Sequence, residues 1–329
     1  MTEVAGADRI AADNHNMSQT PENEQSHDGA KSPAVNMARL GLGTVQFGLD
    51  YGVSNHKGQT LEDEVRHILR TARSEGLRFL DTAPAYGSAE EVIGTCEPED
   101  KPFEIVTKTT PLAEGSGAAS VETIVVDSFR SSCRKLDRTR VHGLMVHHAE
   151  DFLGEHGTEL YDTLCLLKDQ KRVDRIGVSI YDAAEIDAVL GRYDLDLIQV
   201  PLSLFDQRLS DNGYLRDLKR IGFEIHARSV FLQGLMLMQP NDLPPYLRRA
   251  EKHLREFLAY LRKSGTTPIQ AALGFVREVR EVDVALIGVN NLAHLSENID
   301  AYRSAPQVDF AEWGIDDETI LDPRKWANN

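Results

Sequence analysis

The stretch TLEDEVRHILRTARSEGLRFLDTA, residues 60–83, contains the repeating unit that decides the fold. Its first part is predicted to form a helix that ends at Gly76, because its apolar residues recur at helical spacing. These residues are Leu61, Val65, Ile68, Leu69 and Ala72. Its last part, RFLDTA at 78–83, is a short apolar run and is predicted to be a buried strand. Helices that join successive strands are the connections from which parallel sheets are built.

The same alternation continues on both sides of this unit. Further strands are predicted at 39–44, 103–109, 142–148, 175–180, 195–200, 222–227 and 283–289. Helices are predicted after the strands at 88–96, 120–136, 159–169, 183–190, 212–221, 245–263, 268–281 and 292–302. This alternation predicts an α/β fold of the TIM type, a (β/α)8 barrel in a single domain. A doubly wound sheet is disfavoured, because GLGTVQFG at 41–48 lacks the GxGxxG turn.

The first 36 residues differ from the rest of the chain, because they contain no aromatic residue and no apolar periodicity. Six acidic against two basic side chains give this segment a charge of −4. We expect residues 1–36 to form a disordered acidic tail, with a partner-binding arm as the alternative. Residues 37–329 then hold the barrel with a C-terminal extension, and Met37 is a candidate alternative start. The N-terminus lacks the basic and apolar regions of a signal peptide.

The overall composition excludes several classes of protein. The 329 residues carry 36 Lys and Arg against 52 Asp and Glu, a net charge of −16, which argues against nucleic-acid and anionic-membrane partners. No apolar run approaches the ~20 residues of a membrane helix. The three cysteines, Cys96, Cys133 and Cys165, form no CxxC pair, so we expect a reducing, cytoplasmic compartment. No metal site is expected, because His142 and His147 are an odd number of residues apart and a strand turns them to opposite faces.

Polar side chains stand where the second, third and fourth predicted strands end. Asp81 ends the second strand and Tyr86 follows it in the next turn, while Lys108 and His147 end the next two strands. The loops after the strands build the active site of a barrel, so these four groups are expected to converge. An ammonium beside a phenol is expected to lower the pKa of the phenol. Such a set can protonate a carbonyl oxygen while hydride reaches the carbon.

The segments around these four residues resemble the aldo-keto reductase superfamily over residues 39–302. FLDTAPAYGSAEEVIG at 79–94 is similar to the family signature, and IVTKT at 105–109 and GLMVHHAED at 143–151 are similar to its lysine and histidine motifs. The resemblance implies an NAD(P)H-dependent oxidoreductase that moves hydride reversibly between nicotinamide and an aldehyde or ketone. It implies catalytic roles for Asp81, Tyr86, Lys108 and His147, and places His148 in the substrate pocket. GLGTVQFGLDYGVSN at 41–55 resembles a bacterial branch associated with sugar and polysaccharide metabolism, which implies a sugar-like substrate.

The resemblance also implies the residues that bind the cofactor. They are Thr44, Val45, Ser179, Gln199, Arg228, Ser229, Phe231, Gln233, Gly234, Asn290, Glu297 and Asn298. The family relationship places NADP(H) ahead of NAD(H). However, residues 288–294 contain no Lys or Arg to pair with a 2′-phosphate, so NAD(H) remains an alternative. Helix N-terminal amides after Asn291 could receive a phosphate instead.

Three interpretations stay open. The chain could be a regulatory or scaffold protein that binds the cofactor without turnover, although a complete set of four catalytic residues disfavours this. The amphipathic segment 254–263 is expected to cover the barrel, with a substrate lid as the alternative. Trp313 and Trp326 follow the barrel and either dock near its mouth or pack on its surface.

Overall fold

A computed structural model describes residues 35–55, 57–98, 102–112, 120–307 and 309–326. The chain divides into a short unit, Met1–Val35, and a large unit, Asn36–Asn329. The predicted acidic tail, 1–36, lies outside the described residues except for Val35 and Asn36. Asn36 is the first residue of the large unit. Its side chain accepts a hydrogen bond from the amide of Ala38 at 3.1 Å.

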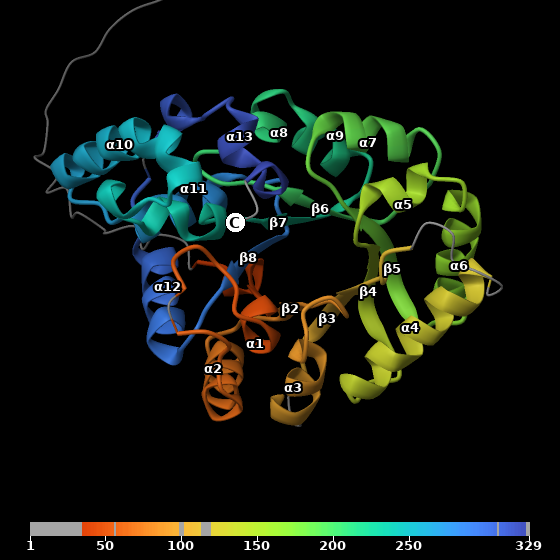
Figure 1. The fold of residues 1–329 in the computed structure, drawn as a ribbon. Coiled ribbons are helices and arrows are strands. Elements are labelled where there is room, and N and C mark those ends of the chain that lie inside the picture. Colours follow the sequence, from red (N-terminus) through yellow and green to blue (C-terminus); the bar gives the residue numbers. More distant parts are fainter. Residues whose placement is uncertain (1–34, 56, 99–101, 113–119, 308, 327–329) are drawn as a thin grey trace, which may run out of the picture. The chain divides into compact units, whose positions relative to one another are not determined.

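Parallel strands close into a barrel in the order of the sequence, which confirms the predicted (β/α)8 fold (Figure 1). Pairing of β1 with β8, Leu40 opposite Ala285, closes the ring. The strands are β1 (Leu40–Gly43), β2 (Phe79–Asp81), β3 (Glu104–Lys108), β4 (Val141–Val146), β5 (Val173–Ser179), β6 (Leu197–Pro201), β7 (Glu224–Arg228) and β8 (Val284–Gly288). Gly177 on β5 allows a tight contact with β6, because a Cβ there would lie 2.1 Å from the carbonyl oxygen of Leu197.

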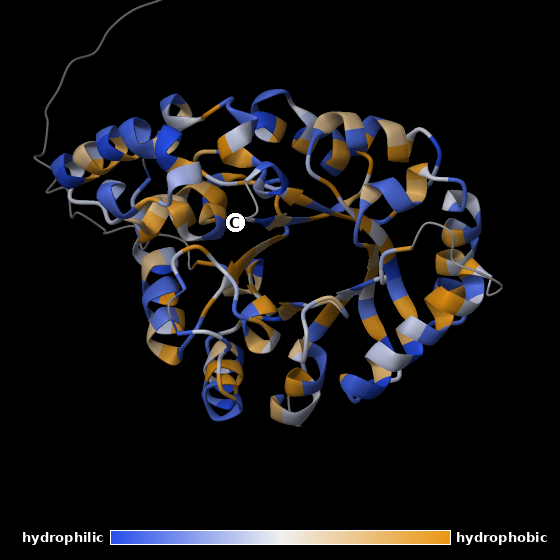
Figure 2. Cartoon of the chain, in the orientation of Figure 1, coloured by the Kyte–Doolittle hydropathy of each residue, from blue (hydrophilic) through white to orange (hydrophobic). Residues whose placement is uncertain are grey.

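Helices surround the strands on the outside of the barrel. The longer ones are α2 (Glu62–Ser74), α3 (Ala89–Cys96), α4 (Val121–Lys135), α6 (Gly157–Asp169), α7 (Ala183–Leu190), α9 (Tyr214–Arg220), α10 (Glu251–Ser264), α11 (Pro268–Glu278) and α12 (Leu292–Ser304). Their faces toward the strands are mainly hydrophobic and their outer faces hydrophilic (Figure 2). None of the helices within the described ranges is both long and apolar enough to cross a membrane.

The structure departs from the predicted helices in a few places. The segment Pro245–Ala250, predicted as part of one helix from 245 to 263, is a 3-10 helix, and α10 begins only at Glu251. Leu61, predicted on the apolar face of the helix at 60–76, lies just before α2 and is 78% exposed. The short helices α1 (Val45–Gly48), α5 (Ala149–Leu153), α8 (Arg208–Asp211) and α13 (Glu318–Leu321) were not predicted. Helices of one turn are too short to show a hydrophobic period.

The end of the barrel opposite the strand C-termini holds a cluster of charged side chains. Glu224, the first residue of β7, lies 2.8 Å from Nε2 of His142 and 2.8 Å from Nε2 of His226. Burial would raise the pKa of Glu224, but hydrogen bonds with these two histidines hold it below its ordinary value. His142 is the second residue of β4 and His147 follows the last residue of this strand, so the two histidines lie at opposite ends of it.

The C-terminal extension packs back onto the barrel. Trp313 contacts the rings of Phe257 and Tyr260 on α10, with ring centroids 5.3 and 5.2 Å apart. Trp326 is buried and donates its indole hydrogen to the carbonyl of Ile320 at 3.0 Å. The apolar residues of α10 are buried, which agrees with the expectation that 254–263 covers the barrel.

Candidate active site

The four predicted catalytic residues stand on neighbouring elements at the C-terminal end of the barrel. Asp81 is the last residue of β2, Lys108 is the last of β3, and His147 follows β4. Parallel pairing places Asp81 opposite Val106 and Lys108 opposite Met145, so each residue stands beside the next strand. Tyr86 lies in the turn between β2 and α3, and its amide donates to the carbonyl of Ala83 at 3.0 Å.

Two glycines let the turn of Tyr86 approach α1 closely. A Cβ at Gly48, the last residue of α1, would lie 1.8 Å from the carbonyl oxygen of Tyr86. A Cβ at Gly87 would lie 2.4 Å from the carbonyl oxygen of Gly48, and Gly87 has φ of +60°. No other residue type fits both restrictions without strain, so this contact fixes where the phenol stands.

Lys108 connects the carboxylate to the phenol. Its Nζ donates to both carboxylate oxygens of Asp81, at 2.7 and 2.8 Å, and lies 3.3 Å from the hydroxyl of Tyr86. It also donates to the carbonyl of Thr82 at 3.2 Å. The side chains of Lys108 and Asp81 are only 1% and 7% exposed, so this ion pair is shielded from water and its geometry is restricted.

The pKa of Tyr86 differs from the sequence-based expectation. Burial raises it above its ordinary value and Asp81 adds to the rise, while Lys108 acts in the opposite direction without overcoming them. The prediction that the ammonium lowers the pKa of the phenol is therefore wrong: Lys108 acts to lower the pKa of Tyr86, but the net shift is upward. Burial also acts against the charge of Lys108, but Asp81 raises the pKa of Lys108 above its ordinary value. At neutral pH Lys108 is therefore charged and the phenol keeps its proton.

His147 stands edge-on to Tyr86, with ring centroids 5.9 Å apart and an interplanar angle of 86°. Burial, assisted by the charge of Lys108, lowers the pKa of His147 to about 3. Its Nδ1 is buried and has no hydrogen-bond partner among the described residues. The imidazole is therefore neutral at physiological pH, and its ring lines a cavity at this end of the barrel.

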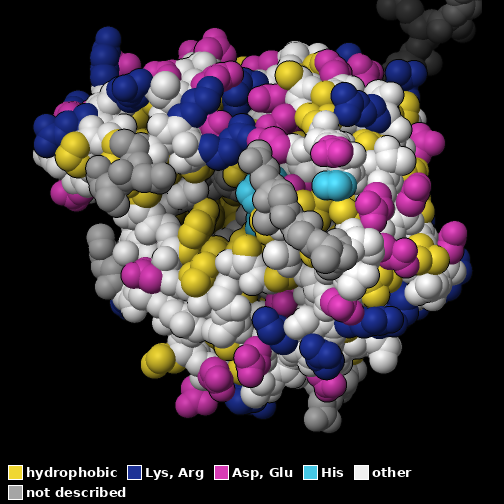
Figure 3. All heavy atoms as spheres, turned by 45° about the vertical axis from the view of Figure 1, so that its right-hand side comes forward, with side chains coloured by type: hydrophobic (Ala, Val, Ile, Leu, Met, Phe, Trp, Pro, Cys, Tyr) yellow, Lys and Arg dark blue, Asp and Glu magenta, His cyan; other side chains and the backbone are white. Residues whose placement is uncertain are grey.

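A cavity of about 440 Å³ opens above these residues. All twelve residues predicted to bind the cofactor line it, together with Asp81, Tyr86 and His147, while Lys108 lies beneath Tyr86 and Asp81. This size is typical of sites for small molecules and cofactors. A space-filling view shows a hollow in one face of the barrel with histidine side chains beside it (Figure 3). His148, predicted to line the substrate pocket, is exposed and is not among the lining residues. Its ring stacks on that of His147, with the ring centroids 4.7 Å apart.

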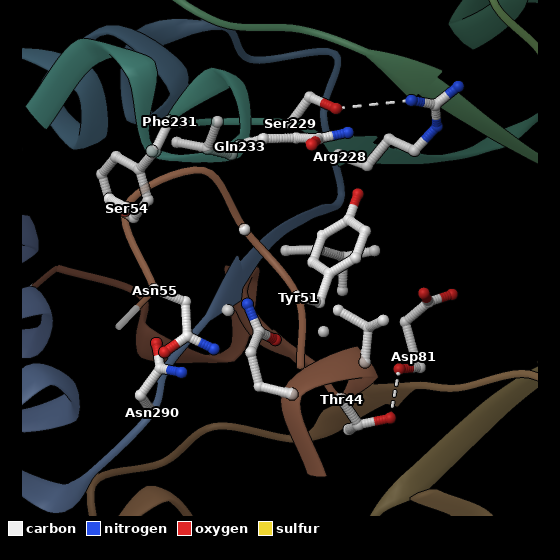
Figure 4. Close-up of a pocket in the computed structure, with 18 of the residues that line it drawn as sticks. Thr44, Tyr51, Ser54, Asn55, Asp81, Arg228, Ser229, Phe231, Gln233 and Asn290 are labelled. Carbon is white, nitrogen blue, oxygen red and sulfur yellow. Dashed lines mark hydrogen bonds between the residues drawn. The ribbon is translucent and has the colours of Figure 1, made fainter. Parts of the chain in front are cut away.

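Several cofactor-site candidates are tied to the catalytic residues. Gln199 donates its amide to Asp81 at 2.8 Å, a contact that the sequence did not predict. The hydroxyl of Thr44 donates to the backbone carbonyl of Asp81 at 2.9 Å (Figure 4). Ser179, at the end of β5, is buried in the same cavity wall. These bonds fix the floor of the cavity in one arrangement.

Arg228 is held by a neighbouring aromatic ring. Its guanidinium carbon lies 4.1 Å from the centroid of the Tyr181 ring, and its Nη2 donates to the carbonyl of Ile180 at 2.9 Å. Arg324, from the C-terminal extension, lies 3.6 Å from the same centroid. Pro323, the residue before it, lines the cavity, so this part of the extension docks at the mouth.

The loop after β7 has an unusual backbone. Positive φ angles occur at Ser229, Leu232 and Gln233, at 63°, 47° and 53°, and Gly234 follows at 97°. A Cβ at Gly234 would also lie 2.2 Å from Oγ of Ser54, so this position requires glycine. Consecutive turns of this kind present backbone N–H groups to anions, and backbone strain of this kind clusters at ligand sites.

The end of the cavity far from Asp81 is bordered by Asn290 and Asn55 (Figure 4). Here Glu64 accepts a hydrogen bond from the amide of Leu292, the first residue of α12, at 2.6 Å. Asn291 accepts another from the amide of His294 at 2.9 Å. These two N-terminal amides of α12 are therefore already bonded within the chain, and phosphate binding at this helix end stays a prediction for the amide of Ala293 between them.

Sequence reasoning missed several residues of the cavity. Tyr51 lines it close to Tyr86, and burial raises the pKa of Tyr51 to about 12. Gln46 and Ser54 belong to the same segment after β1, and Tyr181 follows β5. Gln46 and Tyr181 lie within three residues of a strand end, which would have indicated them, whereas Tyr51 and Ser54 lie further along the loop after β1 and only the three-dimensional contacts identify them.

Comparisons with known proteins agree with this arrangement. A sequence model described as the Aldo/keto reductase family matches residues 39–314. L-galactose dehydrogenase from Arabidopsis thaliana is 23% identical over 274 residues, which cover 80% of this chain and 84% of that protein. Aldo-keto reductase YhdN from Bacillus subtilis is 24% identical over 194 residues, 56% of each chain.

Solved structures show the same fold. The aldo-keto reductase AKR11C1 from Bacillus halodurans, in its holo form, superposes with a TM-score of 0.63 at 19% identity and covers 88% of this chain and 92% of its own. A putative aldo-keto reductase from Pseudomonas aeruginosa superposes with a TM-score of 0.60 at 23% identity and covers 84% of this chain and 95% of its own.

Proposed function

The chain belongs to the aldo/keto reductase family, an oxidoreductase family that acts on carbonyls, and from this premise we propose that it transfers hydride between a nicotinamide cofactor and a small carbonyl compound. The reaction is reversible in principle, so the same site would reduce an aldehyde or ketone or oxidise the corresponding alcohol. The single observation that carries the proposal is the contact of Lys108 with both Asp81 and Tyr86 at the base of the cavity.

The residues of the cavity fit a dinucleotide. Buried polar atoms without partners among the described residues, Oε1 of Gln46 and Nδ2 of Asn290, belong to its lining. The positive-φ loop from Ser229 to Gly234 fits the phosphates, and Ser179 and Gln199 fit the amide of the nicotinamide. A bound nicotinamide would supply the hydride in reduction and take it up in oxidation.

The chain's own residues would handle the proton. In reduction the hydroxyl of Tyr86 donates its proton to the carbonyl oxygen. Burial raises the pKa of Tyr86, which keeps the phenol protonated before the reaction but makes it a weaker acid, so the donation depends on stabilisation of the phenolate. Lys108, 3.3 Å from that hydroxyl, stabilises the phenolate that remains, and Asp81 holds Lys108 in place. His147 is neutral and lines the cavity beside Tyr86, so its imidazole can orient the substrate oxygen.

The substrate is proposed to be polyhydroxylated, such as a sugar or a sugar alcohol. Beside Tyr86 the cavity wall carries the hydrogen-bonding side chains of Tyr51, Tyr181 and Arg228. Of the relatives, one is named for activity on a sugar, L-galactose. Hydrogen-bonding groups beside the catalytic residues favour a substrate with several hydroxyl groups over an apolar aldehyde, because buried polar groups left unpaired disfavour an apolar ligand.

A direct assay tests the proposal. Oxidation of NADH and NADPH is followed with a panel of sugars, short aldehydes and ketones, and reduction of NAD+ and NADP+ with the corresponding alcohols. We expect turnover of at least one hydroxylated carbonyl compound. Measured binding of cofactor without turnover on any compound would instead favour a regulatory or scaffold protein, and absence of any cofactor binding would refute the proposal.

A further inference from the structure

We propose that the end of the cavity far from Asp81 selects NAD(H) over NADP(H). The two determinants are Glu64, which accepts a hydrogen bond from the first amide of α12, and Gln46, whose side-chain amide packs against Gly288. The inference rests on the proposed function, since it assumes that a nicotinamide dinucleotide binds with its adenosine ribose at the end of the cavity bordered by Asn290. The two cofactors differ only at the ribose 2′ position, which carries a hydroxyl in NAD and a phosphate in NADP.

The first observation is the carboxylate at the start of α12. An N-terminal helix turn ordinarily attracts phosphate, because its amides and the helix dipole present positive charge. Here the carboxylate of Glu64 accepts from the amide of Leu292 at 2.6 Å, and the side chain of Asn291 accepts from the amide of His294 at 2.9 Å. A phosphate at this helix end would meet a negative charge, and two of the first three amides of α12 are already bonded.

The second observation is the packing of a neutral amide at the end of β8. A Cβ at Gly288 would lie 2.5 Å from Nε2 and 2.8 Å from Oε1 of Gln46, so the amide of Gln46 fills the space that a side chain would need. The backbone of Gln46 is fixed by a hydrogen bond from the amide of Thr60 at 2.9 Å. Its Oε1 is buried without a partner among the described residues and can accept from a hydroxyl, and the neutral amide has no charge to pair with a phosphate.

The third observation is the distribution of charge. Arg228 is the only Lys or Arg among the described residues that line the cavity, and its contacts with Tyr181 and Ile180 hold it beside the catalytic residues. Glu297 lines the far end, where it adds a second carboxylate to that of Glu64. A phosphate with a charge near −2 would have no guanidinium or ammonium to pair with, only the imidazole of His294 beside the carboxylate of Glu297. A ribose hydroxyl, in contrast, can donate to a carboxylate or an amide oxygen.

Binding measurements test this without relying on turnover. Dissociation constants of NADH and NADPH are measured by calorimetry, and AMP is compared with 2′,5′-ADP as a competitor for NADH. We expect NADH to bind at least about tenfold more tightly than NADPH, a difference of about 1.4 kcal/mol. The variants Glu64→Gln and Gln46→Lys should each reduce the ratio of the NADPH dissociation constant to the NADH dissociation constant several-fold. Glu62→Gln, on the same helix but exposed, is the matched control and should leave the ratio unchanged.

The outcomes separate the two proposals. Binding of NADPH as tight as that of NADH, or tighter, overturns this inference while leaving the proposed function intact. Binding of neither cofactor overturns the proposed function and this inference with it. If Glu64→Gln and Glu62→Gln change the ratio equally, Glu64 is not a determinant. Gln46→Lys leaves the bond of Glu64 to α12 in place, so it tests the charge argument even if Glu64→Gln unfolds.

Discussion

Replacement of Lys108 by methionine tests the buried ion pair beneath Tyr86. The substitution keeps an unbranched apolar chain of similar length and removes the ammonium that contacts both oxygens of Asp81. The carboxylate, 7% exposed, then keeps one side-chain donor, the amide of Gln199 at 2.8 Å. Removal of one partner from a buried pair typically costs about 3–5 kcal/mol. Because the bond from Gln199 remains, we expect the lower end of this range, about 3 kcal/mol.

The assay is urea unfolding followed by circular dichroism, with Lys168→Met as the matched control. Lys168 also contacts both oxygens of one carboxylate, Asp196, at 2.6 Å. Its side chain is 38% exposed, and the partner is 25% exposed, so water screens this pair. Loss of a screened pair typically costs less than about 1 kcal/mol. The double variant Asp81→Asn with Lys108→Met should recover stability relative to Lys108→Met, because it leaves no unpaired charge.

The pH dependence of this effect has a definite sign. The folded-state pKa of Lys108 is raised, so its contribution to stability is fully present at neutral pH. It is lost only as the pH rises above the ordinary value of about 10.4 toward the folded-state pKa. The difference between the wild type and Lys108→Met should therefore stay constant from about pH 6 to 9. A loss below about 1 kcal/mol, equal to that of Lys168→Met, would refute the argument that burial sets the cost.

Three further predictions concern other parts of the barrel. His147 has a pKa of about 3, so the pH profile of kcat/KM for carbonyl reduction should show no ionisation of this residue above about pH 5. An inflection near the ordinary histidine pKa of about 6.5 that disappears in His147→Gln would contradict this. Glu224→Gln should cost about 2 kcal/mol of unfolding free energy at pH 7. The pKa of Glu224 is lowered on folding, so the cost should shrink as the pH falls below about 4, and a pH-independent cost would count against it. Gly177→Ala should cost about 2 kcal/mol or more, because its Cβ would lie 2.1 Å from a backbone oxygen, whereas Gly43→Ala, 3.8 Å from the nearest atom, should cost far less in the same unfolding assay.

The barrel and the grouping of the candidate catalytic residues at one end of it could be predicted because they depend on local patterns. Alternating apolar runs and helical periods indicate the strands and helices, and a parallel barrel then brings Asp81, Lys108 and His147 together at one end. The segment Pro245–Ala250 was wrongly predicted as part of the following helix, because its apolar spacing continues into α10 while its backbone is a 3-10 helix.

The electrostatics of the site could not be predicted in the same way. The raised pKa of Tyr86 depends on how completely neighbouring segments bury its ring, which no spacing reveals. The contact of Gln46 with Gly288 and the bond of Glu64 to Leu292 join positions more than 200 residues apart. His148 follows a strand as pocket residues do, but the turn into α5 leaves its side chain outside the cavity.

The most direct test of the account is the rate of carbonyl reduction by Tyr86→Phe, measured with the best substrate at saturating cofactor. The variant removes one hydroxyl, 3.3 Å from Nζ of Lys108, and keeps the ring that packs against His147. Cofactor affinity should stay within a few-fold of the wild type, which serves as the control for folding. The account predicts that kcat falls by about 10²–10⁴-fold, the typical contribution of a general acid. A kcat within a few-fold of the wild type would show that Tyr86 does not supply the proton.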